Sequence, residues 1–365
     1  DVDREALEGM YVTFPQSLNI IEFFNFDRFG EYVLGNGRQF QPTQVFEPGS
    51  TDAVALAAAN EVNQLRVDDA RGGQNPDPAI HPNGLEFTLE NRFRGGDLVA
   101  NLTGVVDYAF GDYKIQPTHG ADYKAIKNRT EVQEFSGATV RVEAFNVMNL
   151  FTHLDDGDND ICGPLATNEC RGADNETEYI RQRDKIVAGI VGLDADVVGL
   201  MEIENDIRDD EPVYPNQAHD PVIKLVEALN AAEALAGSGY TWDWDIANYY
   251  NNYPVRNEII FRNTVTPLGP PVALQDPAFD GVRPRSDGTL GTDPVGRPPV
   301  AQSFADANGE VFTVVANHFK SKGSGCEDGV YDPDTGELLW IDPASTNGQA
   351  NCNLTRVEQS KAMMD

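Results

Sequence analysis

The sequence predicts a mixed α/β protein built from two parts with different repeat patterns. Residues 1–134 contain short runs of β-favouring residues separated by turn-forming Gly and Asn. From residue 138 onward, apolar strands alternate with amphipathic helices. Turn-rich β runs are typical of a small barrel or sandwich, whereas strand–helix alternation is typical of a layered α/β domain. We therefore expect a small β domain over 1–134 and a larger α/β domain over 138–365.

Six β-rich runs predict the strands of the first domain. They are bounded by turn sequences such as Gly35-Asn36-Gly37 and Arg94-Gly95-Gly96-Asp97. One helix, from Ala53 to Leu65, interrupts the series. The six runs are Met10–Phe14, Leu18–Ile21, Glu31–Leu34, Leu85–Leu89, Leu98–Tyr108 and Tyr113–Gln116.

The second domain follows a polar connector over residues 122–137. A strand is expected over Thr139–Val147, then a helix over Tyr179–Leu193, whose apolar residues share one face. Val197–Ile203 reads as a buried strand. Asp220 and Pro221 are an N-cap and a first-turn proline, so a helix should run from there to about Ala236. Further strands are expected at Tyr240–Ala247, Glu258–Phe261, Pro299–Phe304 and Val311–Phe319.

The composition argues against two broad classes of protein. The 365 residues include 59 acidic and 27 basic side chains, for a net charge of -32. No apolar stretch is long enough for a transmembrane helix, because the most apolar window, Ile186–Leu200, contains Asp194 and Asp196. The composition also argues against a generally basic nucleic-acid binder, since this charge repels a phosphate backbone at long range. Any contact with nucleic acid must use a local site and bound cations.

The four cysteines point to an oxidising compartment. Cys162, Cys170, Cys326 and Cys352 form no C-x-x-C pair and have no histidine at zinc-site spacing. An even number of cysteines in loop sequence favours two disulfides over free thiols, the alternative. Of the three connectivities, Cys162–Cys170 with Cys326–Cys352 is the most local. Disulfides would place the protein in the periplasm, outside the cell or in a secretory lumen.

Polar residues follow three of the apolar strands at the points where these end. A carboxylate there needs a partner, and oxygen ligands suit Mg²⁺, Mn²⁺ or Ca²⁺. A histidine there can exchange a proton near neutral pH, and lysines can hold a phosphate. The alternative is that such Asn and Glu side chains cap turns and that the histidine is structural. The residues are Asn146 and Asn149, then Glu202, Glu204 and Asn205, then Asn317, His318, Lys320 and Lys322.

Taken in order, these segments resemble a known superfamily. "FNVMNLF", "IRQRDKIVAGIVGLDADVVGLMEIEN", "RPPVAQSF" and "NHFKSKG" closely resemble the endonuclease/exonuclease/phosphatase (pancreatic-deoxyribonuclease-like) superfamily, and in particular its secreted bacterial extracellular nucleases. The resemblance covers 138–365. Residues 1–134 resemble the OB-fold-like domain found upstream of such nucleases. The resemblance implies a four-layer αββα sandwich with its active site at one sheet edge, preceded by a small all-β OB-like barrel. That barrel can bind oligonucleotides on one face; the alternative is a spacer or docking module.

The resemblance also assigns roles to individual residues. Asn146 and Glu202 would bind the catalytic Mg²⁺ or Mn²⁺, His318 would be one of two catalytic histidines, and Arg297 would contact the scissile phosphate. Asn149 and Asn205 would lie near the site. Tyr253 and Arg256 would contact substrate, although relatives usually have Asp where this chain has Asn257.

The expected function is that of a secreted, divalent-metal-dependent nuclease acting on extracellular DNA with low sequence specificity; RNA is not excluded as a substrate. One histidine would activate water and another group would assist the leaving oxygen, and each such proton transfer is typically worth ~10²–10⁴ in rate. Two alternatives remain. One is a phosphatase or phosphodiesterase of the same superfamily acting on nucleotides or other phosphoesters. The other is a non-catalytic nucleic-acid-binding or adhesion protein.

The family pattern is not complete in this chain. Relatives carry a later G-D-x-N segment and a D-H segment with the second histidine, whereas no histidine follows His318 here. The final segment, "NLTRVEQSKAMMD", reads as the start of a helix without a stop signal. We expect a C-terminally incomplete polypeptide, with residues 1–365 alone inactive and the second histidine carried by a missing segment.

A separate acidic loop is a candidate calcium site. Asp156, Asp158 and Asp160 alternate along the chain, as carboxylates do in many calcium loops. The twelfth position, where an EF-hand loop has Glu, is Thr167. The alternative is a solvated acidic loop closed by Cys162–Cys170.

Overall fold

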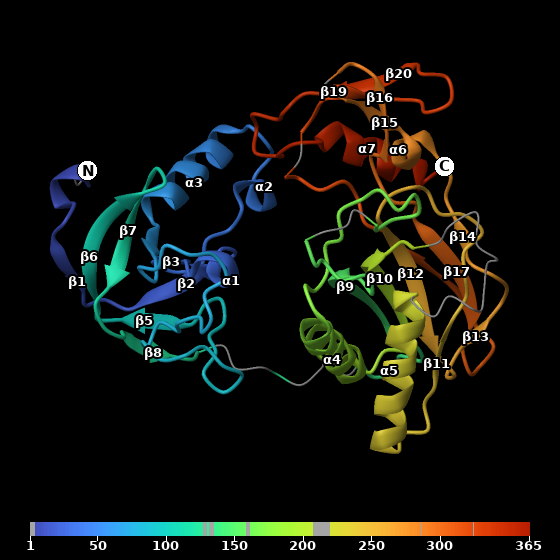
Figure 1. Cartoon of the computed structure of the whole chain (residues 1–365), viewed down its shortest axis with the longest axis horizontal. Helices are drawn as coiled ribbons and strands as arrows, with labels where there is room; N and C mark the ends of the chain where they lie inside the picture. Colours follow the sequence, from blue (N-terminus) through green and yellow to red (C-terminus); the bar gives the residue numbers. More distant parts are fainter. Residues whose placement is uncertain are drawn as a thin grey trace. The chain divides into compact units, whose positions relative to one another are not determined.

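The computed structural model describes residues 4–126, 130, 135–157, 161–206, 220–285, 287–323 and 325–365. The chain divides into two compact units, Asp1–Gln133 and Glu134–Asp365 (Figure 1). This division lies close to the boundary at 134 expected from the sequence. Among the described residues, no helix has the length and apolar character needed to cross a membrane.

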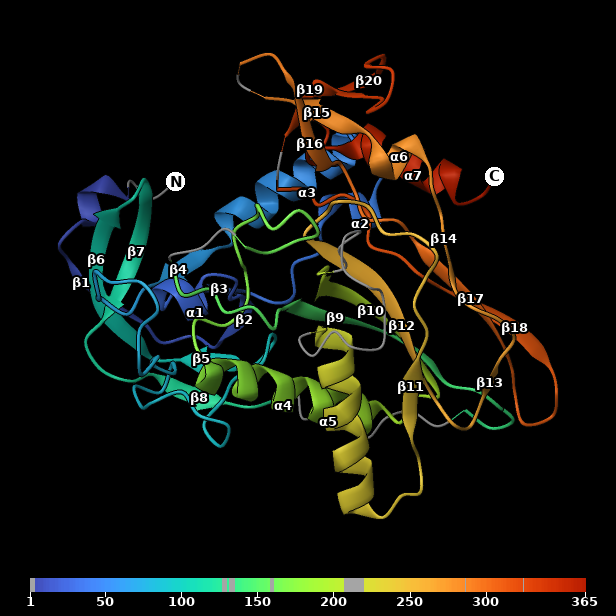
Figure 2. The same ribbon diagram turned by 45° about the vertical axis from the view of Figure 1, so that its right-hand side comes forward.

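The first unit is a curled sheet of eight strands in the order β1-β6-β7-β4-β3-β2-β5-β8 (Figures 1 and 2). Its core is apolar, with Ile20, Leu34, Val67 and Leu102 at most 1% exposed. The elements of this unit are η1 (Glu5–Leu7, a 3₁₀ helix), β1 (Tyr11–Phe14), β2 (Leu18–Glu22), α1 (Phe26–Phe29), β3 (Tyr32–Gly35), α2 (Pro42–Val45), α3 (Thr51–Val62), β4 (Leu65–Val67), β5 (Leu98–Ala100), β6 (Leu102–Ala109), β7 (Asp112–Pro117) and β8 (Asp122–Lys124).

The expected run Leu85–Leu89 is not a strand. It contributes one isolated bridge, Ile80 to Glu86, and its two leucines are exposed, so no neighbouring strand buries them. The predicted run Leu98–Tyr108 is divided into β5 and β6 at Asn101, whose φ of 53° breaks the extended backbone. The short strands β4 and β8 were not expected, because three residues give too little alternation to detect.

The second unit contains three layers. Helices α4 and α5 pack on one face of the sheet β11-β12-β10-β9, through a core that includes Ile190, Leu200 and Leu225. The other face of this sheet packs on a second sheet, β13-β17-β14 with β18 paired to β17, through Ile259 and Phe304. The expected mixed α/β layering is thus confirmed. The elements are β9 (Val142–Leu150), α4 (Glu176–Leu193), β10 (Val197–Glu204), α5 (Pro221–Ala236), β11 (Trp242–Trp244), β12 (Val255–Arg262), β13 (Thr266–Pro267), β14 (Val272–Ala273), β17 (Val300–Ala305) and β18 (Val311–Ala316).

The outer face of the β17–β18 sheet is open in the described part of the chain. Val311 and Val315 of β18 are 65% and 44% exposed there. A second helical layer over this face, which the four-layer sandwich requires, is not among the described residues. β18 also ends at Ala316, so the following Asn317–Lys320 leave the sheet as irregular backbone.

A third small sheet, β16-β15-β19-β20, carries the last helix and was not expected from the sequence. It packs with α6 and α7 near the C-terminus (Figure 1, orange and red). Two disulfides, Cys162–Cys170 and Cys326–Cys352, confirm the local pairing. The elements are α6 (Pro277–Asp280), β15 (Val282–Pro284), β16 (Leu290–Pro294), β19 (Cys326–Tyr331), β20 (Leu338–Asp342) and α7 (Asn353–Ala362).

Candidate functional site

The candidate site begins at a bulge where β9 and β10 end. These strands run parallel and pair in register from Val142–Val197 to Asn146–Met201, after which the register shifts. Glu202 occupies the bulge in β10 with a φ of 63°, a left-handed conformation that is unfavourable for a residue with a side chain. Bulges next to functional sites commonly redirect a side chain. Here the bulge breaks the strict alternation of β10 at the expected metal ligand.

Glu202, His318 and Arg297 form a contiguous set. His318 Nε2 lies 3.8 Å from Glu202 Oε1, and both side chains are 23% exposed. Arg297 Nη2 lies 2.7 Å from His318 Nδ1 and 3.2 Å from Nε2. The three residues come from β10, from the loop before β17 and from the loop after β18. Their meeting supports the grouping expected from the sequence.

Arg297 is buried without an acidic partner. It is 5% exposed, its guanidinium lies over the Tyr253 ring at 4.8 Å, and no described carboxylate forms an ion pair with it. Its Nε has no hydrogen-bond partner in the described residues. Burial lowers the pKa of Arg297, against the attraction of Tyr253 and Glu202. A buried cation in this state is destabilised until an anion arrives.

Lys320 is a second buried cation. It is 5% exposed, and its ammonium group pairs with none of the described residues. Burial, followed by repulsion from Arg283, Arg297 and Arg171, lowers the pKa of Lys320 to about 8. At neutral pH the amine is still mostly charged, so it adds to the positive potential around Arg297.

The backbone of Lys320 is fixed by the last helix. Lys320 N donates to Gln359 Oε1 at 2.9 Å, and Gln359 Nε2 donates to Ala278 O at 3.0 Å. Gln359 is fully buried, and a Cβ on Gly296 would come within 2.6 Å of its Nε2. A glycine before Arg297 is therefore needed for this close approach.

His318 is neutral at physiological pH. Burial and the nearby Arg297 lower the pKa of His318 to about 4, and the attraction of Glu202 opposes them only in part. A neutral imidazole beside a guanidinium donor accepts its hydrogen bond and retains one N–H. His318 can therefore take up a proton during a reaction, provided that a negative charge arrives to offset Arg297.

The remaining residues expected at the site differ in position. Asn146 lies beside Met201, next to Glu202, but its Oδ1 accepts from Met148 N at 2.8 Å within β9. Asn149 lies in the irregular end of the same strand, with a φ of 55°. Lys322 is exposed on the segment that carries Lys320.

The side-chain oxygens of Asn146 and Glu202 are of the type that Mg²⁺ binds. They sit at the ends of adjacent parallel strands, and Mg²⁺ accepts one or two protein ligands with water and phosphate oxygens in the other positions. To bind the ion, Asn146 Oδ1 would have to give up or share the hydrogen bond that it accepts from Met148 N. No third described carboxylate joins them.

Two of the residues expected at the site are buried and bonded to other parts of the second unit. Arg256 is 2% exposed and pairs with Asp206, Asp220 and Glu258. Asn205 is buried and donates from Nδ2 to the carbonyls of Asn251 and Tyr253. The structure does not bring Arg256 to the Arg297–His318 group, whereas Asn205 supports the loop on which Tyr253 lies.

The candidate calcium loop is described only in part. Asp156 is exposed, while Asp158 and Asp160 lie outside the described residues. A separate group of possible ligand atoms, from His153, Cys162 and Glu204, lies close together. Cys162 is bonded to Cys170 and so offers no thiolate, which leaves a His153–Glu204 contact of 2.6 Å.

Three contributors to this region were missed by sequence reasoning. Arg171 and Arg283 act electrostatically on Lys320, and His153 packs against the buried Glu204 at the same end of β10. Arg171 directly follows Cys170, and Arg283 follows the start of a short strand. Neither arginine stands in a strand-end motif. His153 follows the end of β9, and its contact with Glu204 depends on how β9 pairs with β10, which the sequence does not show.

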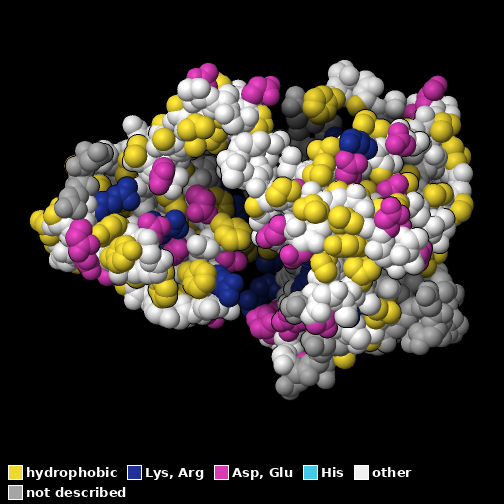
Figure 3. Space-filling view, turned by 90° about the horizontal axis from the view of Figure 1, so that it is seen from above, with side chains coloured by type: hydrophobic (Ala, Val, Ile, Leu, Met, Phe, Trp, Pro, Cys, Tyr) yellow, Lys and Arg dark blue, Asp and Glu magenta, His cyan; other side chains and the backbone are white. Residues whose placement is uncertain are grey.

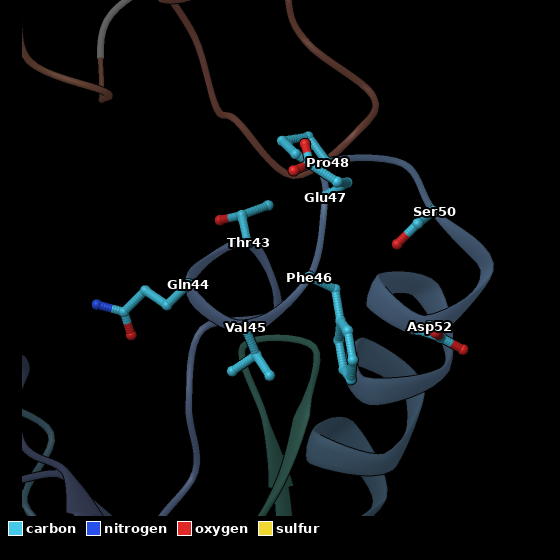
Figure 4. Close-up of a pocket in the computed structure, with 8 residues that line it drawn as sticks. All are labelled: Thr43, Gln44, Val45, Phe46, Glu47, Pro48, Ser50 and Asp52. Atoms are coloured by element: carbon cyan, nitrogen blue, oxygen red, sulfur yellow. The ribbon is translucent and has the colours of Figure 1, made fainter.

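The first unit offers a different surface. A hollow lined by eight residues of α2, the following loop and the first turn of α3 contains no cationic side chain (Figure 4). Arg66 and Arg71 pair with Asp112 and Asp69, respectively. Both of these arginines are therefore engaged by carboxylates.

Charge is distributed unevenly on the molecular surface. Acidic side chains are spread over the face shown in Figure 3, whereas Lys and Arg appear in a few places. With a net charge of -32, the three arginines that act on Lys320 are a local exception.

The family described as Domain of unknown function (DUF8508) matches residues 4–128, which belong to the first unit. No curated protein matches the chain. The second unit, which holds the candidate site, lies outside the matched residues.

Proposed function

We propose that the second unit is the hydrolytic domain of a divalent-metal-dependent nuclease that cleaves phosphodiester bonds of DNA. The observation that carries the proposal is the contact of Arg297 with His318, at 2.7 Å, beside Glu202. Arg297 is a buried cation without a carboxylate partner, which is the property needed to bind a phosphate oxygen. The resemblance of the same segments to the endonuclease/exonuclease/phosphatase superfamily supports the choice of reaction.

Each residue has a role in this proposal. Arg297 and Lys320 hold the phosphate and stabilise the charge that develops on its oxygens. His318 exchanges a proton with the attacking water or the leaving oxygen, and its neutral state at pH 7 allows it to act as the base. Tyr253 packs under Arg297 and keeps its guanidinium in place. Glu202 and Asn146 would hold Mg²⁺ or Mn²⁺, which polarises a phosphate oxygen when bound.

We extend the proposal to the finer architecture. The second unit would be part of a four-layer αββα sandwich, since its two sheets already pack face to face with helices on one side. The first unit would be an OB-like module that contacts nucleic acid. The two disulfides fit a secreted protein in an oxidising environment, and we propose a bacterial extracellular nuclease.

We also propose that residues 1–365 alone bind phosphate but do not cleave DNA. His318 is the single histidine in contact with Arg297 among the described residues, and the reaction of the superfamily uses two.

A phosphatase acting on nucleotides is the second candidate. The same cations would hold a terminal phosphate, so the site chemistry does not separate the two substrates. The OB-like first unit favours a polymer.

The decisive experiment is plasmid nicking with Mg²⁺, compared with EDTA and with phosphate release from nucleotides. It is run with residues 1–365 and with any longer natural form of the protein. Glu202→Gln should abolish cleavage in the active form, while Glu310→Gln, an exposed residue at a turn, should leave it unchanged. Full activity in Glu202→Gln would refute the proposal.

A further inference from the structure

The cations of the site outnumber the anions that the protein places beside them. Arg297 and Lys320 are both 5% exposed, and neither forms an ion pair with a described carboxylate. Arg283 and Arg171 add two more positive charges that act on Lys320. Glu202 is the acidic group that acts on Arg297 and His318. Three arginines therefore act on Lys320, whereas Glu202 is the carboxylate that acts on Arg297 and His318.

The fold holds these cations together against their own repulsion. Arg283 Nη1 donates to Gly325 O at 2.7 Å, directly before Cys326 of the Cys326–Cys352 disulfide. Arg171 directly follows Cys170, and that cysteine packs in the same apolar cluster as Tyr253, whose ring lies under Arg297. Each disulfide thus fixes backbone next to one of the flanking arginines.

A single phosphodiester carries one negative charge, which does not match this excess. Two adjacent phosphate groups in one ligand carry two or more charges, which allows one group to pair with Arg297 and the other with Lys320. Unpaired buried cations gain most from such a ligand, because it replaces the missing counter-charges where water is excluded.

We propose that Arg297, Lys320, Arg283 and Arg171 form a subsite for two adjacent phosphate groups of one ligand. This rests on the proposed phosphate-handling function and specifies its substrate class. A ligand of this kind would be bound through two phosphates. Arg297 would contact the reacting phosphate and Lys320 its neighbour. A substrate with an isolated phosphate would lose the second contact.

The test is calorimetric titration of residues 1–365 with pyrophosphate and with orthophosphate, at low salt with EDTA. We expect pyrophosphate to bind at least tenfold more tightly. Lys320→Met should weaken pyrophosphate binding tenfold or more, whereas Lys185→Met, which removes an exposed lysine of α4, should change it less than threefold. Arg171→Met and Arg283→Met should each weaken it severalfold.

A second readout separates direct contact from a folding defect. Binding should be accompanied by proton uptake near pH 8, because an anion favours the charged form of Lys320. The uptake appears as a heat that depends on the ionisation enthalpy of the buffer, and it should disappear in Lys320→Met. Equal affinity for pyrophosphate and orthophosphate, or wild-type binding by Lys320→Met, would overturn the subsite.

The source of the paired phosphates is resolved with two further ligands. A 5′-phosphorylated dinucleotide that binds more tightly than a nucleoside diphosphate supports a polynucleotide backbone, and the reverse order overturns that source. Pyrophosphate discrimination, combined with unchanged DNA cleavage in Glu202→Gln of the active form, would remove the proposed nuclease mechanism and keep the subsite. DNA cleavage without any preference for pyrophosphate over orthophosphate would keep the nuclease function and remove the subsite.

Discussion

Two buried arginines of the second unit have opposite surroundings. Arg256 is 2% exposed and contacts three carboxylates, Asp206, Asp220 and Glu258. Arg297 is 5% exposed and contacts an imidazole and a tyrosine ring, with no described carboxylate in ion-pair range. Burial disfavours the charge of both residues, yet the pKa of Arg256 is raised overall by its acidic neighbours, while the pKa of Arg297 is lowered.

The comparison separates a structural cation from a binding cation. An arginine matched by internal carboxylates contributes to the fold, and losing it leaves several buried negative charges. An arginine kept from carboxylates is available for an external anion, at a cost in stability. Both residues were expected from the sequence to contact substrate, and only Arg297 has surroundings that suit the role.

The largest expected effect is on stability. Arg256→Met should destabilise the protein by about 3–5 kcal/mol, because three buried carboxylates lose their cation. The loss should be smaller at pH 5 than at pH 8, since burial raises the pKa of Glu258 to about 7 and that of Asp206 to about 6, so both can be neutral in acid. Chemical denaturation at both pH values measures this. Arg297→Met is the matched control, and an equal loss in that variant would break the comparison.

The next effect is on binding. Arg297→Met should weaken phosphate or pyrophosphate affinity ten- to hundredfold, the usual range for a hydrogen bond to a charged group. Its stability should be unchanged or increased, because the substitution removes a buried charge without a partner. Isothermal titration and thermal unfolding report the two quantities on the same sample. Unchanged affinity would show that Arg297 is structural after all.

A smaller effect is expected at Lys320. Lys320→Met should stabilise the protein at pH 7 by roughly 1–3 kcal/mol, because it removes a desolvated charge. The folded pKa of about 8 lies below the ordinary 10.5, so wild-type stability rises with pH across that interval and the gain of the variant shrinks there. Denaturation midpoints at pH 7 and pH 10 measure it. A destabilised variant, or a gain that grows with pH, would contradict this account.

The smallest effect concerns the carboxylates around Arg256. Glu258→Gln should be near neutral below pH 5 and stabilising by about 1 kcal/mol above pH 7. The folded pKa of Glu258, about 7, exceeds its ordinary 4.5, so the wild type loses stability as pH rises between them. A pH series of unfolding free energies for both proteins checks the sign. A loss in the variant at high pH would mean that Arg256 needs all three carboxylates.

The sequence indicated the strand-end residues better than their partners. Glu202 and His318 each end an apolar strand or follow one, and that pattern is local, so their meeting could be expected. The partners of Arg256 could not, because Asp206, Asp220 and Glu258 come from separate segments and only the folded sheet brings them together. Whether a buried arginine pairs with carboxylates therefore depends on residues that are distant in the sequence.

The same reason explains what was missed in the fold. Strands of three residues, such as β4 and β8, are defined by pairing with longer neighbours rather than by their own pattern. The role of Gln359 in fixing Lys320 joins residues 39 apart in the sequence, and α7 was read simply as an unfinished helix. Layering in the second unit was predictable because α4, β10 and α5 are long and strongly patterned.

The central claim is that buried Arg297, next to a neutral His318, binds a phosphate. The most direct test is the NMR titration of His318, assigned with His318→Gln, in free protein and with saturating phosphate. We predict a pKa of about 4 in the free protein, rising when phosphate offsets the charge of Arg297. A free-protein value near the ordinary 6.5, or one that phosphate leaves unchanged, would contradict the account.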